Sequence, residues 1–270
     1  MNKEDLMDLA DNPNFISGIY NYCDRWCERC PFTSRCMVFA MEKERGLDDP
    51  AAHDLESEAF WQTLTETLQA TLEMLQEMVE EEGIDLDSLD IDEEMEEQRR
   101  IEELAWNHEC SGAAQVYADM VDAWFESAED LFAEKEDELN LRVRVDISGD
   151  DPHADAATIE DAVEIIRWYQ YQIEVKLLRA LHGAMEERPA ILEEFPKDSD
   201  GSAKVALIAM DRSIAAWDRL YRQFPEVQDE VLDILVHLDR LRKRTEQEFP
   251  EARAFVRPGF DEVEPGGLDV

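Results

Sequence analysis

Residues 158–187 read TIEDAVEIIRWYQYQIEVKLLRALHGAMEE and carry two apolar stripes at helical spacing. The first stripe is Ala162, Ile166, Tyr169, Ile173, Leu177 and Ala180, and the second is Trp168, Tyr171, Val175 and Leu178. Apolar residues that recur every three or four positions indicate a helix, and a helix that is apolar on two sides packs against neighbours on both. The pattern therefore predicts a central helix in a helical protein.

Similar periodicity extends over most of the 270-residue chain, in which glycine and proline number only ten each. Further helices are expected over residues 54–82, 93–138, 202–224 and 226–248. The interval 139–156 lacks the pattern, and its run LRVRVDIS alternates like a short strand without an evident partner. Because helix formers dominate, the sequence predicts an all-α fold: a multi-helix bundle with a small N-terminal four-cysteine metal-binding helical module.

We expect three parts along the chain. Residues 1–46 form a cysteine-rich metal-binding module, residues 47–249 an acidic helical bundle, and residues 250–270 a flexible C-terminal tail. The first boundary falls in a Gly- and Pro-bearing linker, and the tail is assigned because it carries Pro and Gly without apolar periodicity.

The chain is strongly acidic, with 67 Asp and Glu against 26 Lys and Arg and a net charge of -41. Such a surface repels nucleic acid and anionic membrane, which excludes both as partners and leaves another protein as the partner class. The acid is spread over nearly every helix, and nineteen of the basic residues are Arg against seven Lys. We therefore expect adaptation to high salt rather than nucleic-acid mimicry or a docking face for a basic protein.

The four cysteines near the N-terminus are the strongest chemical signal. Cys23, Cys27, Cys30 and Cys36 lie within fourteen residues in the spacing C-x3-C-x2-C-x5-C. The chain has no long uncharged apolar stretch, and its acidic start is unlike a signal peptide, so we expect a cytoplasmic protein. In a reducing compartment a dense cysteine cluster favours metal over disulfides.

Four thiolates can hold a tetrahedral zinc ion or a four-iron cluster. Structural zinc sites usually pair two C-x2-C knuckles across a longer spacer, whereas this chain supplies all four thiols from one compact loop. We therefore predict a 4Fe-4S cluster with a redox, electron-transfer or sensing role. The alternative is a structural zinc ion in a non-enzymatic protein-interaction module.

The run CERCPFTSRC resembles the C-x2-C-P-x4-C end of the four-iron cluster loop in endonuclease III and adenine-glycosylase type DNA repair enzymes. Cys27, Cys30 and Cys36 match the last three ligands of that loop, and Pro31 matches a proline often found after the third ligand. Cys23 departs, because the first gap is x6 in that family and x3 here. The match covers about fourteen residues and implies a cluster type rather than a DNA repair activity.

Cys23-x3-Cys27-x2-Cys30 also fits the three-cysteine pattern of radical SAM enzymes, but the chain lacks the alternating strands that their barrel requires. A second alternative is an enzyme with a polar pocket in the bundle. His108 lies on an apolar helical face, and Gln170 and Glu174 border the apolar stripe of residues 158–187. The fifth cysteine, Cys110, is expected to be a small buried residue rather than a ligand.

Overall fold

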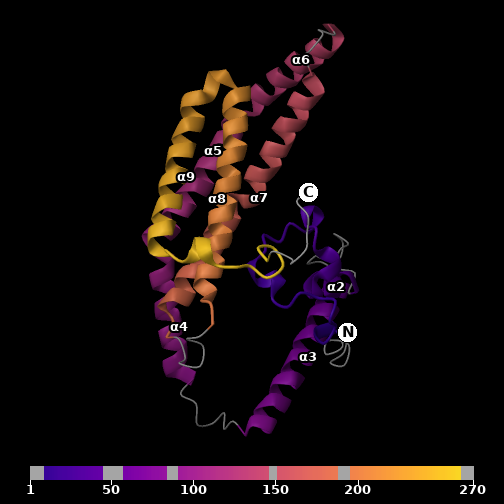
Figure 1. Ribbon diagram of the computed structural model, residues 1–270, viewed down its shortest axis with the longest axis vertical. Helices are drawn as coiled ribbons and strands as arrows, with labels where there is room; N and C mark the ends of the chain where they lie inside the picture. The colour runs from indigo at the N-terminus through magenta and orange to yellow at the C-terminus, as the bar shows by residue number, and fades with distance from the viewer. Residues whose placement is uncertain (1–8, 45–56, 84–90, 146–150, 188–194, 263–270) are drawn as a thin grey trace. The chain divides into compact units, whose positions relative to one another are not determined.

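The computed structural model describes residues 9–44, 57–83, 91–145, 151–187 and 195–262. Within these ranges all regular structure is helical, which confirms the all-α multi-helix prediction (Figure 1). The chain forms two compact units: residues 1–97 together with 256–270, here the N-terminal unit, and residues 98–255, here the bundle unit. In the described ranges no helix is both long enough and apolar enough to cross a membrane.

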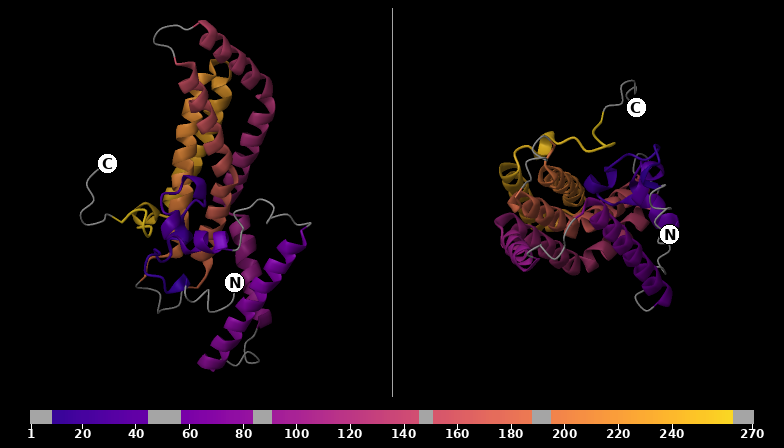
Figure 2. Two further views of the ribbon diagram at one scale, coloured as in Figure 1. Left: turned by 90° about the vertical axis from the view of Figure 1, so that its right-hand side faces the viewer. Right: turned by 90° about the horizontal axis from the view of Figure 1, so that it is seen from below.

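The bundle unit contains a ring of four helices, the helix α6 (Glu129–Val145) and the later part of α4 (Ile91–Trp106), from residue 98 onward. The helices of the ring are α5 (Glu109–Ser127), α7 (Pro152–Met185), α8 (Asp198–Gln223) and α9 (Gln228–Glu248). Helix α5 packs against α7 and α9, and α8 packs against the same two helices, so the four close on one another. Figures 1 and 2 show these four helices side by side, with α6 leaning away from α7 at one end.

The predicted central helix is α7, and its first apolar stripe is fully buried as expected. The prediction that the second stripe packs against a neighbouring helix is wrong, because Tyr171 is 56% exposed and Val175 is 59% exposed. The hydroxyl of Tyr171 donates a 2.6 Å hydrogen bond to Asp122 at the surface. Helix α7 therefore buries one side in the ring and turns part of the other side to solvent.

Aromatic side chains fill one part of the bundle core. Trp217 of α8 is completely buried, and its ring meets those of Trp124 and Phe125 at centroid distances of 5.0 and 6.0 Å. Its indole Nε1–H donates a 3.2 Å hydrogen bond to the buried hydroxyl of Tyr117. The indole thus gains apolar contacts and a partner for its polar atom, which a buried Trp requires.

Two local expectations are corrected. The single helix predicted over residues 93–138 is divided into α4, α5 and α6, with breaks at Asn107–His108 and at Ala128, whereas Gly112 lies inside α5 without ending it. Residues 141–145 of the predicted strand belong to α6, and residues 146–148 lie outside the described ranges. A strand needs a hydrogen-bonding neighbour, and the run instead continues the helix of residues 129–140.

The N-terminal unit contains short 3-10 turns, the eight-residue helix α2 (Met37–Glu44) and the long helix α3 (Glu58–Glu82). Gly83 ends α3 in the left-handed conformation, with φ 64° and ψ 33°, as expected for a C-terminal glycine. The predicted boundaries at residues 46 and 249 differ from the observed division. Of the segment predicted as a tail, residues 252–254 form the 3-10 turn η8 (Ala252–Ala254) and residues 256–262 group with the N-terminal unit.

Candidate metal centre

Three 3-10 turns in succession position the cysteines. The turns are η1 (Ile19–Tyr22), η2 (Cys27–Arg29) and η3 (Thr33–Arg35), and they are followed directly by Cys23, Cys30 and Cys36. Each of these cysteines has extended backbone, while Cys27 opens the second turn. Because 3-10 turns are short and tight, the chain reverses often enough to return four side chains to one place.

The segment between the first two cysteines is a strained turn. Asp24 Oδ1 accepts a 3.3 Å hydrogen bond from the backbone N–H of Trp26, and Arg25 has a positive φ of 56°. A non-glycine residue in the left-handed region costs free energy and persists only where its surroundings hold it. Trp26 is buried beside this turn, and the guanidinium carbon of Arg29 lies 4.2 Å from its ring centroid.

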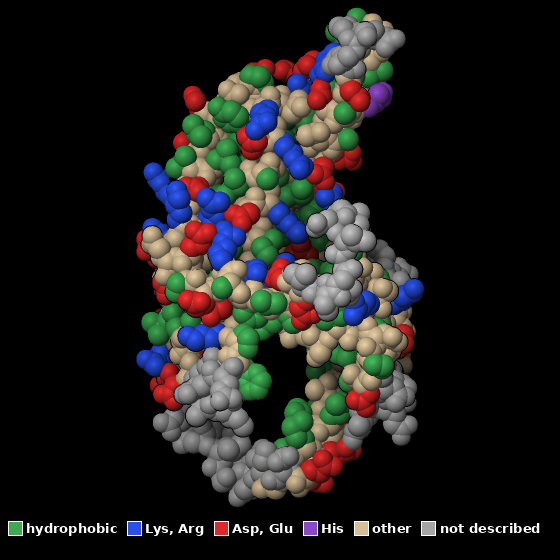
Figure 3. Space-filling model, viewed as in Figure 1, with side chains coloured by type: hydrophobic (Ala, Val, Ile, Leu, Met, Phe, Trp, Pro, Cys, Tyr) green, Lys and Arg blue, Asp and Glu red, His purple; other side chains and the backbone are tan. Residues whose placement is uncertain are grey.

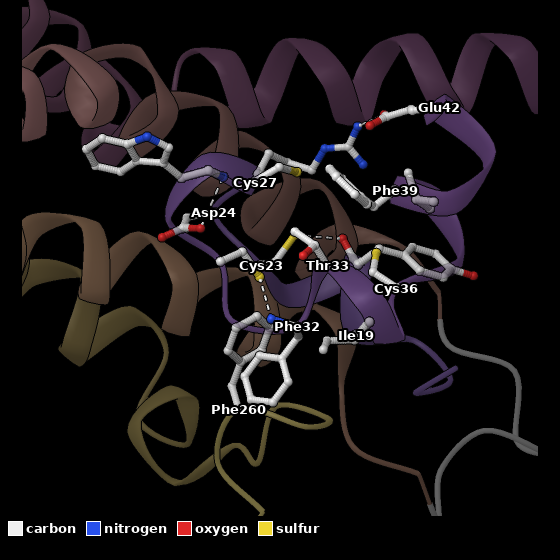
Figure 4. Close-up of a pocket in the computed structure, with 15 residues that line it drawn as sticks. Ile19, Cys23, Asp24, Cys27, Phe32, Thr33, Cys36, Phe39, Glu42 and Phe260 are labelled. Atoms are coloured by element: carbon white, nitrogen blue, oxygen red, sulfur yellow. Dashed lines mark hydrogen bonds and ion pairs between the residues drawn. The ribbon is translucent and has the colours of Figure 1, made fainter. Parts of the chain in front are cut away.

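All four cysteines line one pocket, together with mostly apolar side chains (Figure 4). Its cavity volume is about 20 Å³. The apolar and aromatic walls come from Ile19, Tyr20, Trp26, Phe32, Val38, Phe39 and Phe260. Figure 4 shows Cys23, Cys27 and Cys36 among the residues that line this pocket. The structure therefore brings the four predicted site residues to one common pocket.

The four thiols are half-buried and form no disulfide in the described parts of the chain, and hydrogen bonds reach Cys30 and Cys23. Cys30 Sγ accepts from the backbone N–H of Phe32 at 3.4 Å. Pro31 has no N–H, so Phe32 supplies the first amide after Cys30 that can reach the sulfur. Cys23 Sγ donates to the carbonyl oxygen of Tyr20 at 3.5 Å. Amide hydrogen bonds to sulfur stabilise thiolate charge and tune a bound metal centre.

Electrostatics at the pocket keep the metal-free thiol of Cys27 protonated. Burial, and then the carboxylate of Glu42, raise the pKa of Cys27 to about 11, while Arg25 acts in the opposite direction. Arg25 Nη2 and Glu42 Oε1 form an ion pair at 2.6 Å. A metal must therefore displace a proton from Cys27, which is ordinary for thiolate ligands.

The residues after the bundle supply a wall of the pocket that sequence reasoning missed. Phe260 meets Phe32 edge-on with ring centroids 5.1 Å apart. Gly259, with φ +74°, brings the backbone so close that an added Cβ would lie 2.9 Å from Ile16 and 3.0 Å from Ile19. The Arg257 guanidinium bonds Asp261 at 2.9 Å and closes this turn. A single glycine and a single aromatic carry no periodicity, so the pattern of residues 250–270 gave little sign of this packing.

The donor set suits a thiolate metal centre, but the sulfur atoms are not in ligand geometry. Across the described parts of the chain, no three Cys, His, Asp or Glu side chains form a group that could hold a metal ion as they stand. The cavity is just large enough for one water molecule. A single ion would require the sulfurs to turn inward, and a four-iron cluster would require the walls to move apart.

The structure does not bring His108 and Gln170 together. His108 is the N-cap of α5, where its Nδ1 accepts a 3.2 Å hydrogen bond from the backbone N–H of Cys110. Gln170 instead donates a 3.0 Å hydrogen bond to the carbonyl oxygen of Ala118. Ala118 lies ten residues after His108, which corresponds to roughly 15 Å along a helix. Glu174 is half-buried, one turn beyond Gln170.

Cys110 is fully buried at the start of α5, as expected for a small core residue. Burial is the main cause that raises the pKa of its thiol to about 11. It lies in the bundle unit, whereas the other four cysteines lie in the N-terminal unit.

Comparisons with protein-family models, with curated proteins and with solved structures found no match to this chain.

Proposed function

We propose that this chain is a metal-binding helical protein in which Cys23, Cys27, Cys30 and Cys36 together bind one 4Fe-4S cluster that serves electron transfer or sensing. The observation that carries the proposal is that all four thiols line the same apolar pocket. The compact C-x3-C-x2-C-x5-C spacing and the local resemblance to a four-iron cluster loop favour the cluster over other occupants.

The surrounding residues have definite parts in this proposal. The amide of Phe32 stabilises negative charge on Cys30 Sγ, and the positive side chains of Arg25 and Arg29 offset the charge of a thiolate-bound centre. Phe32 and Phe260 restrict the access of water. When bound, the cluster would supply one-electron redox chemistry whose potential depends on these hydrogen bonds and on burial.

A structural zinc ion is the second candidate, and the size of the cavity favours it. A volume of about 20 Å³ is closer to a single ion than to a cluster of eight iron and sulfide atoms. Zinc would join the 3-10 turns and α2 without redox chemistry.

Anaerobic purification followed by metal analysis and visible spectroscopy separates the two candidates. The cluster predicts brown protein with about four iron and four sulfide per chain, whereas structural zinc predicts colourless protein with about one zinc. Cys36→Ser should lose most of the bound metal, and Cys110→Ala serves as the matched control that keeps it. Protein that binds neither metal, or Cys36→Ser protein with an unchanged metal content, would overturn the metal-binding proposal.

A further inference from the structure

Helix α3 of the N-terminal unit exposes large apolar side chains along most of its length, and Figure 3 shows hydrophobic side chains at the surface of this helix in one view. The helix has 25 residues and is therefore roughly 37 Å long. Its large apolar side chains are between 38% and 58% exposed: Trp61, Leu64, Leu68, Leu72, Leu75 and Met78. Helices in water gain most of their stability from packing an amphipathic face, so a face of this length indicates a packing partner.

The sequence of α3 has a seven-residue repeat. With Trp61 at the first position of a heptad, the positions usually called a are Trp61, Leu68 and Leu75, and those called d are Leu64, Thr71 and Met78. This a/d pattern is the seam of a coiled coil, in which side chains of one helix insert between those of another. Three heptads fit between Trp61 and Glu81.

Between residues 60 and 80 the charges of α3 lie away from this seam, and the glutamates in or beside it are confined to the helix ends, at Glu58, Glu81 and Glu82. Glu66, Glu73 and Glu80 occupy the outermost position of each heptad. Gln62 and Gln69 donate to Glu66 and Glu73 at 3.0 and 3.2 Å, so their hydrogen bonds stay on the outer surface. Between residues 60 and 79 the positions that flank the seam carry no charge: Phe60, Thr65, Thr67, Leu72, Met74 and Val79.

Two threonine hydroxyl groups, one beside the seam and one within it, already have partners in the helix. Thr65 Oγ1 donates to the carbonyl oxygen of Trp61 at 2.8 Å, and Thr71 Oγ1 donates to that of Thr67 at 2.9 Å. Burial of these threonines against another helix would leave no hydroxyl donor unsatisfied. The face therefore suits an apolar surface and offers little to a polar one.

We propose that α3 is a self-association surface and that its occupant is α3 of a second copy of this chain. A basic partner helix would be selected through acids at the seam edges, and between residues 60 and 79 those edges are neutral. A second α3 presents the same apolar a and d residues and keeps its own outer glutamates away from the contact, so the high negative charge does not meet itself there. This inference is independent of the metal centre.

The test is the oligomeric state of the full-length protein by sedimentation over a roughly hundredfold range of concentration. The wild type should form dimers, more strongly at high salt because screening reduces repulsion between two acidic copies. Leu68→Glu and Leu75→Glu should each weaken dimerisation at least about tenfold, because each places a charge in the seam. Gln76→Glu adds the same charge outside the seam and should leave the dimer unchanged.

Thr71→Leu tests the same surface by a gain of dimerisation rather than a loss. A leucine at d should strengthen dimerisation by roughly tenfold, whereas Gln76→Leu should not. A wild type that stays monomeric over the whole concentration range would overturn the proposal. Equal weakening of dimerisation by Leu68→Glu and Gln76→Glu would also overturn it. Both results are independent of whether the protein binds metal.

Discussion

The cysteine-bearing segment and the helical bundle are stabilised in different ways. Within residues 9–44, Ile19 and Trp26 are the only buried side chains, and the cysteines are held by 3-10 turns of three or four residues. The bundle unit buries large side chains from α5, α7, α8 and α9 around Trp217. Apolar burial alone can stabilise the bundle, whereas the cysteine segment has little of it, and the metal proposed above would supply another source of stability.

Metal removal should have the largest effect on this contrast. With a chelator under anaerobic conditions, residues 9–44 should become sensitive to protease within minutes to hours, because the thiolate bonds that hold the 3-10 turns are lost. Limited proteolysis with mass spectrometry would locate the cuts, and helical circular dichroism would report on the bundle.

The bundle unit provides the internal control for this experiment. Its helical signal and its protease-resistant fragment should persist after chelation. Equal loss of resistance in residues 98–255 would contradict the idea that the two regions have separate sources of stability.

Trp217→Ala should have the next largest effect, this time in the bundle. The side chain is fully buried and contacts the rings of Trp124 and Phe125, so its removal should lower the free energy of unfolding by about 3–5 kcal/mol. Chemical denaturation followed by circular dichroism measures the change. Tyr171→Ala is the matched control on the exposed side of α7, with an expected cost below about 1 kcal/mol. Equal costs would mean that the bundle does not depend on its aromatic core.

Alkaline pH should lower the unfolding free energy of the bundle through Tyr117. Among the three predictions, we expect this effect to be the smallest. Burial, the main cause, raises the pKa of Tyr117 from 10.0 to about 12, because the phenolate would lose its hydration. The unfolded state then releases the proton first, so this contribution to stability is complete below pH 10 and is lost as the pH rises from 10 to 12.

Tyr117→Phe isolates this effect, since Phe cannot ionise. The fall in unfolding free energy between pH 9 and pH 11 should be about 1 kcal/mol smaller in the variant than in the wild type. Equal slopes for the two proteins would show that Tyr117 does not contribute to the alkaline loss of stability.

The helical class and the buried stripe of α7 could be predicted because residues such as Ile166 and Ile173 repeat at the helical period. The breaks within residues 93–138 could not, because His108 acts there as an N-cap through its ring nitrogen, a role usually held by Ser, Thr, Asp or Asn. The exposure of Tyr171 was also missed, since periodicity identifies an apolar face but not whether another helix covers it.

For the candidate site, the sequence identified the four thiols and their common location, because short spacing forces proximity. It did not reveal the contribution of Phe260, which is more than 220 residues from Cys36 and reaches the pocket through tertiary packing. Metal binding and the identity of the metal both stay predictions from spacing and resemblance.

The position of Phe260 also affects the order in which the protein can be built. The four cysteines come before residues 98–255 in the chain, and Phe260 comes after those residues. During synthesis the four thiols therefore leave the ribosome long before the aromatic ring that lines their pocket, and the bundle can fold in the interval. The proposed cofactor would therefore meet the finished pocket only after translation has passed residue 260.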